Sequence, residues 1–84
     1  MQGETAVIEF RSVSQNIDED LEVPLNITAN DLIRALNEIY HLDLDINALS
    51  RCSIKLSNTF GLISGGKVLG KYGVRNGTIA MIEE

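Results

Sequence analysis

The sequence is poor in the residues that build reactive or metal-binding centres. Its 84 residues include one cysteine and one histidine. A lone cysteine cannot form an internal disulfide, and it cannot supply the four thiolates of an iron–sulfur cluster. His41 has no cysteine, aspartate or second histidine at the spacing of a metal site or a nucleophile. We therefore expect no catalytic residue, no metal and no cofactor, with Cys52 as a buried structural thiol and His41 in a surface or capping role.

Long apolar runs and an excess of basic residues are also missing. No apolar stretch approaches the roughly 20 residues of a membrane span. Residues Met1–Thr5 have neither the basic nor the apolar region of a signal peptide. These absences predict a cytoplasmic protein without direct membrane insertion. The formal net charge of −5 argues against non-specific binding to nucleic acid.

What is present is an ordinary globular balance, with 44% hydrophobic and 23% charged residues. A chain of 84 residues fits one small domain, which we expect to span 1–84 with an ordered core at about 5–82. The charges are unevenly spread, because acids dominate the first half while most of the bases lie beyond residue 46. This asymmetry is either solvated surface or the complement of an oriented, oppositely charged partner.

Alternation of apolar and polar residues predicts the strands. Ile8 and Phe10 alternate with Glu9 and Arg11, and a polar turn follows at 14–20. Pro24 closes the second strand or marks an edge position. The expected strands are 6–13, 21–23, 52–57, 62–63 and 78–82.

One amphipathic helix is expected between the second and third strands. The Thr28 hydroxyl can cap a free amide at its start, and Asp31 favours the positive end of the helix dipole. The apolar residues that follow have the spacing of one helical stripe: Leu32, Ile33, Leu36, Ile39 and Tyr40.

The order of these elements predicts an α+β fold. One helix must cover one face of a mixed sheet of four to five strands, because neither can bury its apolar side alone. With the first and last strands central and parallel, this arrangement is the β-grasp (ubiquitin-like) fold. The predicted core contains Ile8, Phe10, Leu21, Val23, Leu32, Ile33, Leu36, Tyr40, Ile54, Leu56, Leu69, Ile79 and Met81.

Two ligand-binding motifs are matched only in part. Gly61–Lys67 fits a phosphate-binding P-loop up to its lysine, but Val68 has no hydroxyl for magnesium. Asp43–Asn47 resembles the start of a calcium loop, but Ala48 stands where a sharp turn needs glycine. The first segment is explained by a strand followed by a glycine turn. The second is explained by a solvent-exposed chain at the end of the helix.

Several segments resemble ubiquitin: Leu21–Val23, the capped helix with Ile33, Leu36 and Tyr40, and Leu62–Leu69. The ending Leu69–Ile79 is similar to that of the small tailless bacterial proteins of the YukD/EsaB family. It has an apolar residue, a turn that contains a tyrosine, an aliphatic residue, and a glycine turn into the last strand. The resemblance extends over about residues 6–82.

The resemblance implies a non-catalytic accessory or regulatory component of a bacterial type VII (WXG100/ESX-like) secretion system. Its partner would be a protein component of the membrane machine, so the chain could act at the inner face of the membrane through that partner. The alternative is a small β-grasp accessory subunit of a multicomponent bacterial monooxygenase. Protein modifiers need a terminal glycine carboxylate for adenylation, and no glycine follows Gly77, so we expect no covalent conjugation.

A binding surface is predicted on the sheet face away from the helix. Val7, Ile63, Ala80 and Ile82 are expected to form a small apolar patch, with Arg11, Lys55 and Lys67 as its charged rim. Ile63 and Lys67 also match the place where ubiquitin-like proteins carry their recognition patch. The alternative is a scatter of exposed aliphatic residues. On the first interpretation, Ile63→Asp should weaken partner capture and leave the fold intact.

Overall fold

A computed structural model describes residues 4–44, 52–57 and 62–83 of the chain. The elements in chain order are β1 (Thr5–Ser12), β2 (Ile17–Pro24), α1 (Ala29–Tyr40), β3 (Ser53–Leu56), β4 (Leu62–Ile63), the 3-10 helix η2 (Leu69–Tyr72) and β5 (Ile79–Glu83). The segment 58–61 between the third and fourth expected strands, and most of the calcium-like segment 43–47, lie outside the described residues.

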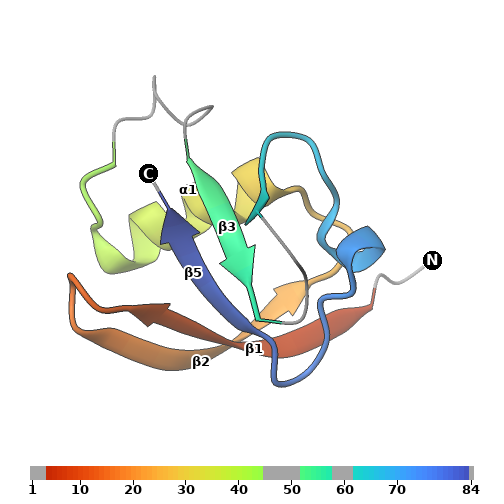
Figure 1. Ribbon diagram of the computed structural model, residues 1–84, viewed down its shortest axis with the longest axis horizontal. Helices are drawn as coiled ribbons and strands as arrows, with labels where there is room; N and C mark the ends of the chain where they lie inside the picture. Colours follow the sequence, from red (N-terminus) through yellow and green to blue (C-terminus); the bar gives the residue numbers. More distant parts are fainter. Residues whose placement is uncertain (1–3, 45–51, 58–61, 84) are drawn as a thin grey trace.

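β1 and β5 are parallel and lie at the centre of the sheet, whose strand order is β2-β1-β5-β3-β4. The other neighbouring strands pair antiparallel. Figure 1 shows α1 crossing behind β3 and β5, with the β1–β2 hairpin along the lower edge. The predicted α+β class and the β-grasp arrangement are confirmed.

The helix begins as its sequence predicts. The Thr28 hydroxyl accepts a hydrogen bond from the Asp31 amide at 3.1 Å, and the Asp31 carboxylate accepts one from the Thr28 amide at 3.2 Å. Together these bonds form a capping box that satisfies two amides of the first turn.

The helix ends at Tyr40, and His41 is its C-cap, with an N–H that donates to the Asn37 carbonyl. The left-handed backbone of His41 turns the chain so that the Leu42 N–H donates to the same carbonyl at 3.2 Å. His41 is exposed at this cap, in line with the expected surface or capping role.

The core lies between α1 and one face of the sheet. Most predicted core residues are buried there, and Leu21 and Tyr40 pack half-buried against them. Phe10 stacks against Tyr40 with ring centroids 5.3 Å apart, which joins β1 to the last turn of α1. Cys52 is buried, as expected. The buried members of the predicted core are Ile8, Phe10, Val23, Leu32, Ile33, Leu36, Ile54, Leu56 and Leu69.

The core residues predicted for the last strand are the wrong ones. Ala80 is 1% exposed and faces the core, whereas Ile79 and Met81 point to the opposite face. Ala80 pairs with Phe10 on one side and Leu56 on the other, and a small side chain fits between these two large ones. All four residues from Ile79 to Ile82 are apolar, so no polar residue among them indicates which side faces the core.

The same error affects β4. Ile63 pairs with Ile54 and is 2% exposed, while Leu62 pairs with Lys55 and faces out. Ile82 also pairs with Ile54 and packs against the core. A further correction concerns β2, which starts at Ile17, so most of the expected polar turn is strand. Its polar residues are tolerated in a strand because β2 lies at the edge of the sheet.

Candidate protein-interaction surface

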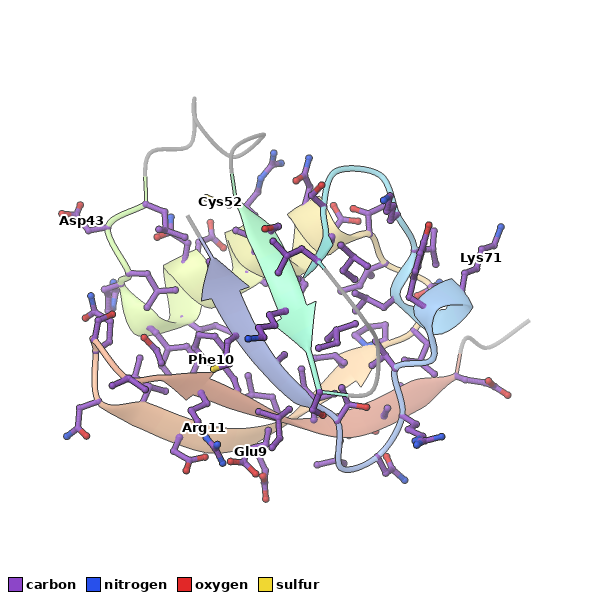
Figure 2. All side chains as sticks on the ribbon, viewed as in Figure 1. Glu9, Phe10, Arg11, Asp43, Cys52 and Lys71 are labelled. Atoms are coloured by element: carbon purple, nitrogen blue, oxygen red, sulfur yellow. The ribbon has the colours of Figure 1, made fainter. Side chains whose placement is uncertain are left out.

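We call the sheet face opposite α1 the outer face. Strand register defines it, because residues that pair directly across strands point to the same side. Figure 2 shows Phe10 on the helix side of β1, with Glu9 and Arg11 on the other side. The outer face receives side chains from all five strands: Val7, Glu9, Arg11, Asp18, Asp20, Glu22, Ser53, Lys55, Leu62, Ile79 and Met81.

The centre of the outer face is apolar. Ile79 and Met81 are half-buried on β5, and Val7 and Leu62 are 44% and 49% exposed on β1 and β4. The register places Lys55 between Met81 and Leu62. We call Val7, Leu62, Ile79 and Met81 the apolar patch. It occupies the face that the sequence predicted, but only Val7 is common to the predicted and observed sets.

The structure separates the predicted site residues into three groups. Val7, Arg11 and Lys55 lie on the outer face. Ile63 and Ala80 are buried, and the half-buried Ile82 pairs with Ile54 and packs against the core, so none of the three lies on the outer face. The third group is Lys67 alone, which lies in the loop after β4. The expectation of an exposed patch made by these buried residues is therefore wrong, for the facing reason given above.

Lys67 follows β4 and lies toward η2. Its ammonium group is 5.7 Å from the centroid of the Tyr72 ring, a cation–π distance. Its carbonyl accepts a hydrogen bond from the Ala29 amide at 2.8 Å, which fixes the loop against the start of α1. Lys67 is exposed, but its side chain is directed at Tyr72, so its place in the charged rim stays a prediction.

Arg11 is engaged by two carboxylates of its own chain. It pairs with Glu9 on the same strand, and its Nε lies 3.9 Å from the Asp18 Oδ2 across the hairpin. The pairing raises the pKa of Arg11. A guanidinium that is already paired offers less charge to a partner, so the cation of this face that remains for a partner is Lys55 among the described outer-face residues.

The pKa values of the Glu9 and Asp18 carboxyls shift in opposite directions, because a hydrogen bond joins the two side chains. That bond to Asp18, together with the pairing to Arg11, lowers the pKa of Glu9. The same bond raises the pKa of Asp18. The acidic groups of β1 and β2 lie on one side of Ile79 and Met81, and Lys55 lies between Met81 and Leu62.

The residues missed by sequence reasoning are Leu62, Ile79 and Met81. The alternation of Ile54, Lys55 and Leu56 shows that Lys55 points outward on β3. The residues that pair with Lys55 on β4 and β5 must then point outward too, and these are Leu62 and Met81. This inference requires the pairing register of the strands, which cannot be read from the sequence.

Two further observations bear on chemistry. Among the described residues, no group of three His, Cys, Asp or Glu side chains is placed to hold a metal ion. Within the same ranges, none of the helices has the length and apolar character needed to cross a membrane.

The fold is that of a ubiquitin-like β-grasp domain. The sequence matches no protein-family model and no curated protein. Several solved structures have a similar fold. The ubiquitin-like domain of tubulin-binding cofactor B is similar with a TM-score of 0.76 and 20% identity, over 96% of this chain and 90% of that one.

Two other ubiquitin-like domains are informative. The C-terminal domain of mouse tubulin-specific chaperone e has a TM-score of 0.70 and 18% identity, over 98% of this chain and 88% of that one. The ubiquitin-like domain of the Mycobacterium tuberculosis type VII secretion system protein ECCD1 has a TM-score of 0.61 and 14% identity, over 96% of this chain and 99% of that one. At these identities the likenesses establish a shared fold.

Proposed function

We propose that this chain is a non-catalytic module that binds a protein partner non-covalently through its apolar patch. The main supporting observation is that Val7 and Leu62 are exposed on the same sheet face as the half-buried Ile79 and Met81. An apolar centre with charged neighbours is the composition of many protein interfaces. Ubiquitin-like domains in general act as interaction modules, which supports the same conclusion.

We further propose that the partner belongs to the membrane machinery of a bacterial type VII secretion system. On this proposal the chain is a cytoplasmic accessory or regulatory component, held at the inner face of the membrane by its partner. The likeness to the ECCD1 domain supports this assignment, together with the resemblance of the sequence to the YukD/EsaB family.

The second candidate is a tubulin-chaperone type of module. It is favoured by the higher TM-scores to the domains of cofactor B and chaperone e. The two candidates differ in the partner, so one binding experiment separates them.

The test uses the tagged protein with two purified partners. These are the detergent-solubilised type VII secretion complex of the native host, and tubulin. We expect the secretion complex to co-purify with the wild-type chain and tubulin not to do so. Capture of tubulin alone would favour the second candidate, and capture of neither would contradict both.

Variants locate the surface. Met81→Asp and Leu62→Asp place a charge in the apolar patch, where apolar surface must lose water on binding, so both should reduce capture at least about tenfold. Ile39→Asp is the control, because Ile39 is an exposed apolar residue of α1, 59% accessible and away from the outer face. Melting curves confirm that each variant is folded. Full capture by folded Met81→Asp and Leu62→Asp proteins would move the interface off this face.

A further inference from the structure

The β2 edge is the longer open border of the sheet. β2 is eight residues long and stands first in the strand order, so within the described residues only β1 pairs with it. The opposite border is β4, which has two residues. An unpaired strand of this length exposes a row of backbone donors and acceptors to which another chain can add as a strand.

The register shows which backbone groups are open. The Leu25 amide donates to the Glu4 carbonyl at 2.8 Å, one pair beyond Thr5 and Pro24. In an antiparallel pair, hydrogen-bonded and non-hydrogen-bonded pairs alternate. The odd-numbered residues of β2 therefore bond β1, and the even-numbered residues Asp18, Asp20 and Glu22 direct their N–H and C=O groups to the open edge.

The same three residues carry the charge. Val23 and Leu21 pair with the core residues Ala6 and Ile8, so the residues between them point to the outer face. Asp18, Asp20 and Glu22 are all exposed. Every second residue of β2 thus has an open backbone pair and a carboxylate on the same side of the sheet. Glu22 also accepts a hydrogen bond from the Thr5 hydroxyl at 2.7 Å, and Asp18 faces Arg11, so within the described residues Asp20 is the carboxylate of the three without a hydrogen-bond or ion-pair partner in its own chain.

Side chains on the helix side of β2 hold the strand against α1 and the core. The Tyr40 hydroxyl donates to the Glu19 Oε1 at 2.8 Å, which links α1 to the middle of the strand. Ile17 and Leu21 pack against the core from the same strand. An incoming strand would therefore meet an edge that is held in place by its own domain, which lowers the ordering cost of binding.

Charge selects the occupant. Pairing of β2 with a second copy of itself would set carboxylates opposite carboxylates, and like charges directly opposite one another are destabilising. We propose that the β2 edge binds an extended segment of a partner protein with lysine or arginine at every second position, which adds as a sixth strand. Its cations face Asp18, Asp20 and Glu22 on the outer face. This site is distinct from the apolar patch and does not depend on the identity of the partner proposed above.

The probe is a synthetic peptide of about nine residues with lysine at alternate positions and threonine or valine between them. The whole chain, labelled for NMR, is titrated with it. We expect the largest amide shifts at Asp18, Asp20 and Glu22, and intermolecular contacts in strand register. A peptide of the same composition with its lysines in one block is the first control, and it should bind at least about threefold more weakly.

Two modifications separate strand addition from simple charge attraction. N-methylation of the peptide residues that face the edge removes backbone donors and keeps the charge, so it should abolish the specific shifts. Asp20→Asn with Glu22→Gln removes two carboxylates at constant shape and should weaken binding at least about threefold. Glu38→Gln on the exposed side of α1 is the matched control and should bind as wild type.

The proposal is overturned if the blocked-lysine or N-methylated peptide binds as well as the alternating one. It is also overturned if β2 shifts depend on protein concentration without peptide, since that result assigns the edge to a second copy. Met81→Asp should leave peptide binding intact, so failure of the patch and failure of the edge are separate results.

Discussion

Gly70 lies directly against the backbone of Leu25. Its N–H donates to the Leu25 carbonyl at 2.9 Å, and a Cβ at position 70 would lie 3.0 Å from that same oxygen. η2 therefore approaches the chain between β2 and α1 more closely than any residue with a side chain could without displacing it.

The first prediction tests this approach with Gly70→Ala. The added methyl group meets a backbone oxygen that cannot rotate away, so the free energy of unfolding should fall by roughly 1–3 kcal/mol. Gly66→Ala is the control, because a Cβ there meets nothing within 4 Å. Urea unfolding of both variants checks the difference, and equal stability of the two would show that Leu25 can give way.

The second prediction concerns the packing of α1. Leu36 is 1% exposed beneath the sheet, so Leu36→Ala should reduce the free energy of unfolding by roughly 2–5 kcal/mol. Ile39→Ala removes a side chain of similar size from the exposed side of the same helix, and its effect should stay within about 0.5 kcal/mol. Thermal or urea unfolding distinguishes them. A Leu36→Ala protein as stable as Ile39→Ala would contradict the packing.

The third prediction concerns Ile63 and Leu62. Ile63→Asp places a carboxylate in the core, where a charge without a partner is costly, so the chain should lose its cooperative transition or melt far below wild type. Leu62→Asp, one residue earlier, puts the same group on the outer face and should fold. Circular dichroism melts of the pair read this directly, and a well-folded Ile63→Asp protein would mean that β4 faces the other way.

The fourth prediction is a pH dependence from Tyr40. Burial and the hydrogen bond to Glu19 raise the pKa of the Tyr40 phenol from 10.0 to about 12. The unfolded chain therefore releases this proton at lower pH than the folded chain, so the stabilising contribution is complete below pH 10.0 and is lost as the pH rises to about 12. Tyr40→Phe should remove this slope from the free energy of unfolding. The same slope in both proteins would assign it to other groups.

The fifth prediction concerns the Glu9–Asp18 pair. By NMR titration, the Glu9 carboxyl should have a pKa below its ordinary 4.5, and the Asp18 carboxyl a pKa above its ordinary 3.8. As the pH falls, the lowered pKa of Glu9 removes stability while the raised pKa of Asp18 adds it, so the two effects oppose each other. Asp18→Ala should raise the pKa of Glu9, and an unchanged Glu9 titration would show that the two do not share a hydrogen bond.

The sequence predicted the fold because two independent periods agreed. The stripe that includes Leu32 and Leu36 has the helical spacing, and Ile8 and Phe10 have the strand spacing, so each element has a defined apolar side. Thr28 and Asp31 fixed the start of the helix by local hydrogen bonding alone. These features depend on near neighbours in the chain, which is why they can be read without a structure.

The candidate surface could not be predicted in the same way. From Ile79 to Ile82 every residue is apolar, so alternation carries no information about which ones face the core. Phe10 and Leu56 pair with Ala80 from the two neighbouring strands, and a small side chain suits a place between two large ones, so the facing depends on these neighbours. That is a contact between strands far apart in sequence, and its outcome moves the exposed patch by one residue along β5.

The parallel pairing of β1 with β5 has a consequence for how the domain forms. The central contact of the sheet, between Glu9 and Ile79, joins the first and last strands of the described chain. Pairings of such long sequence separation require most of the loop-closure entropy to be lost before they form, and they slow folding. Before β5 arrives, the hairpin and β3 have no strand between them, and Phe10 lacks one wall of its pocket. We expect folding to be limited by the arrival of the last strand, with the hairpin and helix assembled earlier.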